Sequence, residues 1–529
     1  MTITTAKLPL KALRLTPLAL AALLMSAECR ADWKLTPTIG IAETYSDNPG
    51  LQQGDEAHGQ WISESIPGFT LRSRSRRLRL DASGEWHFYA YQDKNTPNTH
   101  DRERRYALDL DAKLVDDLLM LETRANGSRQ AISAFGPRFT EAYSNFNRTD
   151  VQTWSISPVL HHRFGNAAEL QMRVTRDSVQ TDGDVTANAF SDSKSTTGLF
   201  NLASPANSGN RFGWSLQYLR QDLQTDRFGD STSVNASATL NYRLTDTLSA
   251  VGTVGHDSYE YTTINNRTGG PSYLGGFVWT PTTRTSIDAR FGHSYLGRTG
   301  SLMAVQRNRN LVSQLMYTDQ VTTTRAQFLL PAAIDTAAML DRLFSSTISD
   351  PAARALAVQA YIAATGLPPS LANNINYLSN RFMRDRRLQA AYIYNMPHSS
   401  MTLAVYRSER IALSLQQSDS ELLGSQLNSL NDSVRQKGAD FSFNYRLSAR
   451  TGINASASVN RSTSLDTGIE SPSHRLSVGL TRRFDRKTSG IVELRHTVST
   501  GGLPSLNTVA LGPGRYTENA IKATLSVQL

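Results

Sequence analysis

The chain has 529 residues, of which 39% are hydrophobic and 19% charged, with a formal net charge of +9 and one cysteine. This composition is too apolar for an intrinsically disordered protein. The longest apolar run, residues 15–25, is well short of the roughly 18–20 residues that a membrane-spanning helix needs. A helical inner-membrane protein is therefore excluded, whereas several soluble domains or one large barrel remain.

Residues 1–31 have the three parts of a bacterial secretory signal. The basic residues Lys7, Lys11 and Arg14 precede the apolar run, and residues 26–31, which follow it, are rich in small side chains. We predict cleavage after Ala31. A lipid-modified Cys29 is the alternative, although Glu28 stands where a lipoprotein signal has a small residue. Since the exported chain would contain no cysteine, disulfides could not stabilise it.

Beyond the signal, apolar and polar residues alternate with a period of two, which predicts β-strands. In residues 77–92, Leu78, Leu80 and Trp86 lie on one face, and Arg79 and Asp81 on the other, because successive side chains of a strand point to opposite sides. The same alternation recurs at residues 105–114, 168–175, 212–219, 234–242 and 521–529. Each predicted strand therefore has one apolar and one polar face.

The connections between these strands differ in length. Short turns rich in Gly, Asn, Asp and Pro are predicted at residues 116–117, 165–166, 245–246, 281–282, 397–398, 449–450 and 485–487. Longer polar loops are predicted at residues 46–59, 131–149, 181–191, 416–431 and 501–515. Short turns at one rim and long loops at the other are typical of outer-membrane barrels.

These patterns predict an all-β fold, a transmembrane antiparallel outer-membrane β-barrel of about 22 strands (20 to 24), formed by residues 32–529. The count of 22 requires a hairpin within residues 308–330 that turns near Asp319; otherwise about 20 strands result. A soluble β-sandwich or β-helix is the alternative. It would have to bury long charged strand faces, which is costly without partners.

Residues 331–379 depart from the strand pattern and predict a short helical insertion. Helices are expected at residues 334–344 and 350–366, the second with Asp350 as N-cap, Pro351 in the first turn and Gly366 after its end. Strand parity places the insertion at the long-loop rim. We predict that it plugs or gates the barrel; an extracellular lobe that covers nothing is the alternative.

Charged strand faces in a membrane barrel must point into the lumen, because an Arg or Lys facing mid-bilayer lipid costs about 2–4 kcal/mol. The charges could simply pair and stabilise a polar interior, or they could line a wet passage with a basic bias that favours acidic sugars or other anions. The lumen-facing candidates are Arg77, Arg79, Asp81, Glu85, Arg105, Asp109, Asp111, Glu169, Arg173, Arg387, Gln389, Arg475, Arg483, Glu493 and Arg495.

No nucleotide-binding loop, zinc cluster or lipase elbow is recognisable, so we expect no cofactor, no catalytic or metal site, no enzyme activity and no nucleic-acid partner. Two alternatives stay open. His256 and Ser258 share a strand face, as in a barrel hydrolase, but no third group that would orient the imidazole can be identified. Asp177, Asp182 and Asp184 could hold calcium, although a solvated acidic loop is the simpler interpretation.

Residues 33–48 (WKLTPTIGIAETYSDN) and 61–68 (WISESIPG), together with the closing YTEN of residues 516–519, resemble the PEP-CTERM-system-associated outer-membrane barrel family. These proteins are associated with exopolysaccharide gene clusters of Gram-negative bacteria. The resemblance implies a role in exporting or anchoring extracellular polysaccharide, and it supplies no catalytic residues.

We therefore predict a porin-like barrel in the outer membrane of a Gram-negative cell that acts in export or assembly of extracellular polysaccharide through a polar, charged lumen. Its expected partners are outer-membrane lipid, the barrel-assembly machinery and exopolysaccharide export components. A structural or surface-docking barrel with a closed lumen is the first alternative, and a barrel hydrolase is the second.

Overall fold

The computed structural model describes residues 32–94, 96, 99–137, 143–144, 146–182, 190, 192–205, 211–227, 229–260, 268–282, 284–329, 377–414, 430–500 and 515–529. The predicted signal peptide, residues 1–31, lies outside these residues. The helices predicted at residues 334–344 and 350–366 also lie outside them.

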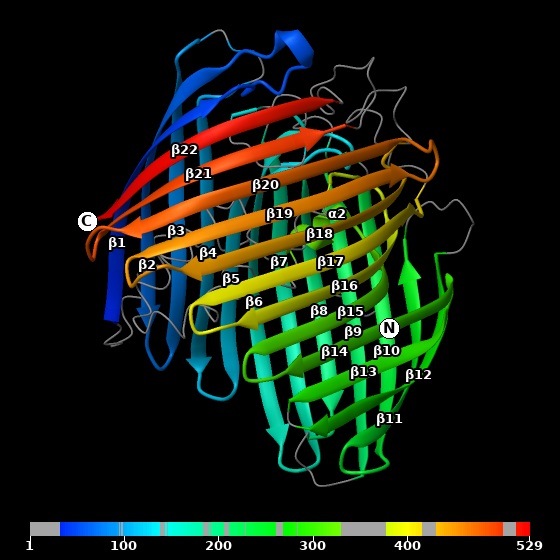
Figure 1. The fold of residues 1–529 in the computed structure, drawn as a ribbon. Helices are drawn as coiled ribbons and strands as arrows, with labels where there is room; N and C mark the ends of the chain where they lie inside the picture. Colours follow the sequence, from blue (N-terminus) through cyan, green and yellow to red (C-terminus); the bar gives the residue numbers. More distant parts are fainter. Residues whose placement is uncertain are drawn as a thin grey trace, which may run out of the picture.

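The described chain forms one 22-stranded antiparallel sheet that closes on itself, because β1 pairs with both β2 and β22 (Figure 1). The predicted fold class is confirmed. The strands are Asp32–Ser46 (β1), Gln60–Arg74 (β2), Leu78–Tyr91 (β3), Arg102–Val115 (β4), Leu119–Ala131 (β5), Arg148–Phe164 (β6), Ala168–Asp182 (β7), Ser193–Ala203 (β8), Phe212–Thr225 (β9), Gly229–Arg243 (β10), Leu248–Tyr259 (β11), Gly269–Thr282 (β12), Thr285–Ser294 (β13), Gly297–Arg307 (β14), Leu311–Thr322 (β15), Met383–Asn395 (β16), Ser399–Ala412 (β17), Ser433–Arg446 (β18), Thr451–Ser464 (β19), Glu470–Arg483 (β20), Thr488–Ser499 (β21) and Tyr516–Gln528 (β22).

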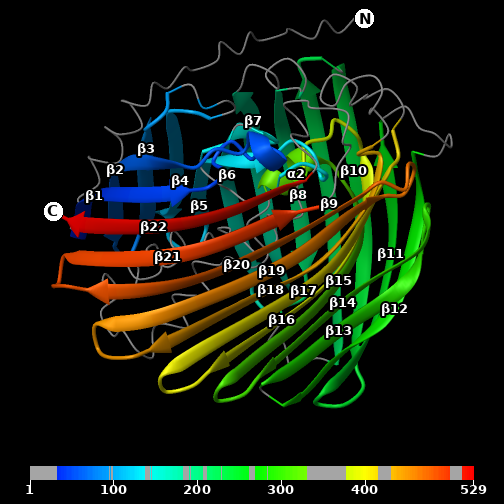
Figure 2. The ribbon, with the colours of Figure 1, turned by 45° about the horizontal axis from the view of Figure 1, so that its top comes forward.

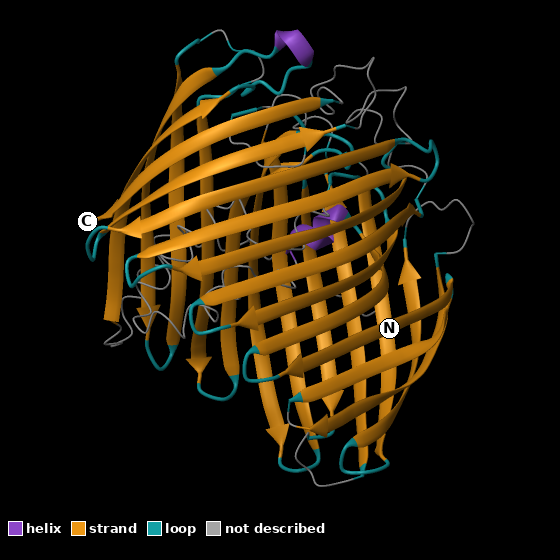
Figure 3. Cartoon of the chain, viewed as in Figure 1, coloured by secondary structure: helices purple, strands orange, loops and turns teal. Residues whose placement is uncertain are grey.

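Within the described residues, two short helices accompany the strands: the 3-10 helix η1 (Gly54–Glu56) and the α-helix α2 (Thr324–Leu329). Figures 2 and 3 show α2 inside the barrel. No helix among the described residues is long and apolar enough to cross a membrane.

The position of α2 identifies the lumen face of the sheet. Its Arg325 contacts Asp177 on β7 and Ser193 on β8, so these two side chains point into the barrel. The pairing register then assigns every second residue of each neighbouring strand to the same face. On β9 the opposite, outward face carries Phe212, Leu216 and Tyr218, all at least 45% exposed. An apolar outward surface of this kind is what contact with lipid requires.

The two rims carry the connections in the predicted way, with exceptions. Short turns join strands at one rim, for example at residues 75–77, 116–118, 165–167, 308–310 and 396–398, and long loops such as residues 47–59 and 413–432 join them at the other. The long-loop rim also has short links at residues 226–228, 295–296 and 465–469. The connection between β15 and β16, which contains the predicted insertion, leaves from the long-loop rim.

The predicted turn near Asp319 is wrong, although the strand count is right. Asp319 lies inside β15, and its carboxylate accepts hydrogen bonds from Arg384 on β16 at 2.8 and 2.6 Å. Aspartate favours turns when its side chain bonds the local backbone. Here a cation on the neighbouring strand binds that side chain, so the residue is compatible with a strand.

Candidate functional site

The strand register places the predicted lumen candidates on the lumen face, with one exception. Arg77 belongs to the turn between β2 and β3 and donates a hydrogen bond to Asp116 of the next turn, at 2.7 Å. The others share the face of Asp177 and Ser193: Arg79, Asp81, Glu85, Arg105, Asp109, Asp111, Glu169, Arg173, Arg387, Gln389, Arg475, Arg483, Glu493 and Arg495.

Most of the charged candidates are paired with a charge of opposite sign. Arg79 lies 3.3 Å from Asp81, and Arg173 lies 3.0 Å from Glu122 on β5. Further pairs are Arg105–Glu103, Arg124–Asp109, Arg163–Glu169, Arg387–Asp385, Arg475–Glu493 and Arg495–Glu518. The pairing agrees with the first of the two predicted interpretations, in which the charges stabilise a polar interior.

Burial divides the lumen into two parts. We call the wall formed by β16–β22 and β1–β7 the filled half, because side chains such as Arg410, Thr497 and Glu518 are at most 1% exposed there. The wall formed by β8–β15 is the open half, where lumen-facing Gln217 and Asn241 are exposed. The predicted charged candidates all belong to the filled half or to its turns.

A buried polar network joins the strands of the filled half. Glu64 on β2 binds His87 on β3 at 2.6 Å and Lys522 on β22 at 2.7 Å. A second ion pair links β21 to β22, where the guanidinium of Arg495 lies 2.9 Å from the carboxylate of Glu518. Glu518 also accepts a hydrogen bond from Ser46 on β1. This network therefore spans the point where the barrel closes.

The loop between β5 and β6 reaches into this network. Tyr143 is 2% exposed and donates a hydrogen bond to Thr44 on β1 at 3.2 Å. The guanidinium of Arg495 lies over the Tyr143 ring at 6.0 Å. Tyr143 is thus held against the wall of the lumen.

Helix α2 bridges the lumen between opposite walls. On one side, Arg325 binds Asp177 and donates to Ser193 at 2.7 Å; burial lowers the pKa of its guanidinium, and the Asp177 carboxylate opposes that shift. On the other side, Gln327 contacts Asp385 on β16 and accepts a hydrogen bond from Arg410 on β17. We call α2 with these two anchors the crossbar.

Residues 377–379, the end of the predicted insertion, pack beside the crossbar. Tyr377 is 0% exposed, its carbonyl accepts a hydrogen bond from Thr324 at 3.1 Å, and Arg410 lies over its ring at 5.1 Å. Around them an apolar cluster extends across the lumen, and we call it the partition. It consists of Ile132, Ala134, Phe135, Val151, Val179, Phe190, Tyr377, Leu378, Met383, Leu430 and Val434, with Phe328, Leu329 and Ile469 packed against it.

The open half has a lumen face of different chemistry. On β8–β12 this face carries no charged residue other than Asp257 and, near the short turns, Arg243. We call it the neutral wall; its hydrogen-bonding side chains include Ser193, Ser195, Thr197, Asn201, Ser215, Gln217, Gln221, Thr225, Ser231, Ser233, Asn235, Ser237, Thr239, Asn241, Ser249, Thr253 and Ser272. The alternation in the sequence already predicts a polar face for strands such as β9 and β10, but only the register shows that these faces lie side by side as one wall.

The hydrolase and calcium alternatives gain no support from the geometry. His256 points outward, and its cross-strand neighbours are Ala236 and Pro271, neither of which has a side chain that could orient an imidazole. Asp177 binds Arg325 and Ser195, so its carboxylate is engaged within the protein. The side chain of Asp182 and the whole of Asp184 lie outside the described residues. In the described part of the chain, no group of three or more His, Cys, Asp or Glu side chains could hold a metal ion.

No family model matches the chain, and no curated protein sequence matches it. Among solved structures, the FrpB iron transporter from Neisseria meningitidis in its apoprotein form is 9% identical, covers 93% of this chain and 81% of that chain, and has a TM-score of 0.50. The siderophore receptor PirA from Pseudomonas aeruginosa is 9% identical over 94% of this chain and 80% of that chain, with a TM-score of 0.44. The ferric enterobactin receptor PfeA from the same organism is 11% identical over 94% and 81%, with a TM-score of 0.45.

At such identities the likeness to FrpB shows the fold alone. It agrees with the closed 22-stranded sheet and its apolar outward face. The chain is therefore an outer-membrane β-barrel protein.

Proposed function

We propose that this protein is a gated outer-membrane passage for an extracellular polysaccharide. The observation that carries the proposal is the neutral wall. Hydroxyl and amide side chains can donate and accept hydrogen bonds, as sugar hydroxyl groups do. A passage needs contacts that are favourable enough for entry but weak and numerous enough for release, and a polymer sliding along many neutral side chains meets this requirement.

The state of the lumen supports gating. A barrel of 22 strands is wide enough that transporters of this size keep their lumen plugged. In this protein the crossbar and the partition obstruct the lumen with the chain's own segments, and the crossbar is held by side-chain contacts at both ends. Moving a segment held in this way would open a path along the neutral wall.

The substrate class also rests on the resemblance of residues 33–48 and 61–68 to exopolysaccharide-associated barrels. One expectation of the sequence analysis changes. Because most lumen charges are paired with charges of opposite sign, we do not propose that a basic lumen selects acidic sugars. Uptake of an iron chelate is the second candidate, since the FrpB barrel with a TM-score of 0.50 is described as an iron transporter.

Single-channel recording in planar bilayers tests the proposal. Residues 323–379 are replaced by a short Gly-Ser linker, which can close the gap because Thr322 and Met383 are paired neighbours at the ends of β15 and β16. We expect low conductance for the parent barrel and high conductance for the variant. Maltohexaose, a neutral glucose hexamer, should interrupt the variant's current.

The outcomes separate the two candidates. Current interruptions by maltohexaose, without tight binding of ferric enterobactin, support the polysaccharide passage. Tight binding of ferric enterobactin by the parent, with no interruption by maltohexaose, would favour iron uptake. A variant that assembles but conducts no better than the parent would contradict the gating part of the proposal.

A further inference from the structure

An aligned row of three cations crosses the outward face of β17, β18 and β19. Arg407 pairs in register with Lys437, and Lys437 pairs with Arg461. We call these residues the cation row. Adjacent strands are about 4.8 Å apart, so the row covers about 10 Å of the barrel's circumference. Like charges directly opposite each other on neighbouring strands are destabilising, so an external anion would stabilise this arrangement.

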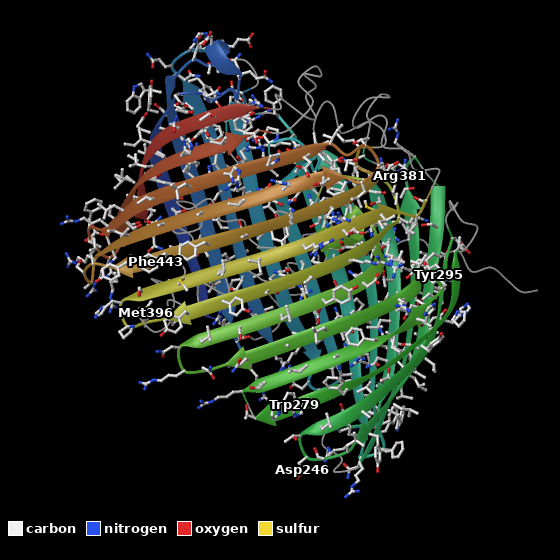
Figure 4. All side chains as sticks on the ribbon, turned by 45° about the vertical axis from the view of Figure 1, so that its right-hand side comes forward. Asp246, Trp279, Tyr295, Arg381, Met396 and Phe443 are labelled. Carbon is white, nitrogen blue, oxygen red and sulfur yellow. The ribbon has the colours of Figure 1, made fainter. Side chains whose placement is uncertain are left out.

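The row marks the outer edge of the apolar surface on these strands. The next outward residues toward the short-turn rim are Val405, Ala439 and Val459, which form the adjacent row in register. Val405 and Val459 are 38% and 48% exposed. On β18 the apolar outward face continues through Phe443, which Figure 4 labels near the short-turn rim. The cations therefore lie where the hydrocarbon region ends on the long-loop side, which in outer-membrane barrels is the extracellular side.

The carboxylates nearby neutralise the row only in part. Arg461 lies 3.4 Å from Glu470, and Arg407 lies 4.0 Å from Glu409, which also binds Arg435 at 3.2 Å. Lys437, in the centre, is exposed and has no ion pair within the described part of the chain. The side chains of Arg407 and Arg461 are 60% and 46% exposed, so both remain accessible to a ligand.

Another part of the outward face, around Arg220 on β9, has no comparable row of cations. On β9, Arg220 binds Asp222 two residues along the same strand, and its cross-strand neighbours are Gly198 and Val234. That cation is already paired, and no second cation stands beside it in register. This sector therefore has no such row, so the partly neutralised row of β17–β19 does not follow simply from the presence of charges near the rim.

We propose that the cation row binds the phosphate groups of lipopolysaccharide in the outer leaflet. Lys and Arg form short, charge-assisted hydrogen bonds with phosphate oxygens, and basic residues beside an apolar surface are a known mode of anionic-lipid recognition. The lipid's acyl chains would contact the apolar outward residues on the short-turn side of the row, such as Val405 and Val459, while its phosphates bind the cations. This site is independent of the lumen and of the proposed passage.

The test measures lipid A binding to the purified barrel in detergent by native mass spectrometry. The triple variant Arg407→Gln, Lys437→Gln and Arg461→Gln removes the row, and Arg76→Gln, Arg486→Gln and Lys487→Gln removes the same charge from the short turns. We expect the first variant to lose about a hundredfold in affinity for diphosphorylated lipid A, from the usual contribution of three basic residues near an anionic surface. The second variant should bind like the parent.

Further arms identify the source of the phosphate. Lipid A without phosphate should bind the parent as weakly as diphosphorylated lipid A binds the row variant, and inorganic phosphate should compete only at high concentration. Heat-modifiable gel mobility verifies that each variant is folded, and Lys437→Arg should retain binding. Equal lipid A affinity of the parent and the row variant would overturn the proposal. Equal binding of phosphorylated and phosphate-free lipid would overturn it too.

Discussion

The two halves of the lumen solve the problem of a polar interior differently. In the filled half, charged side chains are buried and held in networks such as Glu64 with His87 and Lys522. In the open half, the lumen face of β8–β12 is mostly neutral, and side chains such as Gln217 and Asn241 are exposed, although Ser193 and Ser195 beside the crossbar are buried. Buried charges need fixed partners because the interior does not solvate them, whereas neutral groups in contact with water do not. The filled half is therefore suited to rigid anchoring, and the open half to transient contact with a solute.

We expect the two halves to differ most in the stability that is lost when one member of an ion pair is removed. Glu64→Ala leaves Lys522 and His87 buried without their carboxylate, and such a loss costs about 3–5 kcal/mol. Asp288→Ala in the open half breaks a half-exposed pair with Arg290, which is worth about 0.2–1 kcal/mol. The unfolding temperature, followed by heat-modifiable gel mobility, should fall strongly for the first variant and little for the second. Similar losses would contradict the division into two halves.

A second prediction concerns the outward face and the lumen face of the sheet in the open half. Val254 on β11 is 62% exposed on the outward face, and the adjacent Thr253 faces the lumen. Val254→Arg directs a charge at lipid and should cost about 2–4 kcal/mol near the middle of the bilayer. Thr253→Arg places the same side chain in a hydrated lumen and should assemble normally. Assembly yield in outer-membrane fractions gives the comparison, and equal yields would argue against the assigned faces.

The third prediction concerns the attachment of the crossbar to the wall. Arg325→Ala removes its contacts with Asp177 and Ser193 and leaves the Gln327 anchor in place. We expect more frequent openings in planar bilayers, because one end of α2 is released. Arg290→Ala, an arginine of the open half that does not touch α2, serves as the control and should behave like the parent. If both variants open equally often, the crossbar does not control the lumen.

Much of the barrel could be predicted from the sequence, because the alternation of apolar and polar residues along each strand is a local pattern. The lumen candidates from Arg79 to Arg495 fell on the expected face for this reason, since a period of two fixes which side chains share a side. Asp319 shows the limit. Its environment depends on Arg384, which is far away in the sequence and adjacent only through the pairing of β15 with β16.

The crossbar and the partition could not be predicted for the same reason. The partition brings together Ile132, Val179, Tyr377 and Leu430, which come from different loops and strands. No periodicity connects such residues, because their contact depends on how loops fold into the lumen. The neutral wall is a different case. Its residues alternate regularly in the sequence, but hydroxyl and amide side chains carry no charge that must face away from lipid, so the argument from charge does not identify them.

The smallest expected effect concerns the neutral wall itself. Asn201, Gln217 and Ser237 form one row in register across β8, β9 and β10. Gln217→Leu removes a hydrogen-bonding group from the centre of this row, and a single hydrogen bond contributes about 0.5–1.5 kcal/mol. In the linker variant that lacks the crossbar, maltohexaose should therefore interrupt the current for a time shorter by about two- to tenfold. Gln224→Leu makes the same change on the outward face of β9 and should leave the interruptions unchanged. Equal interruption times for the two variants would mean that sugars do not touch this wall, and the open half would then need another role.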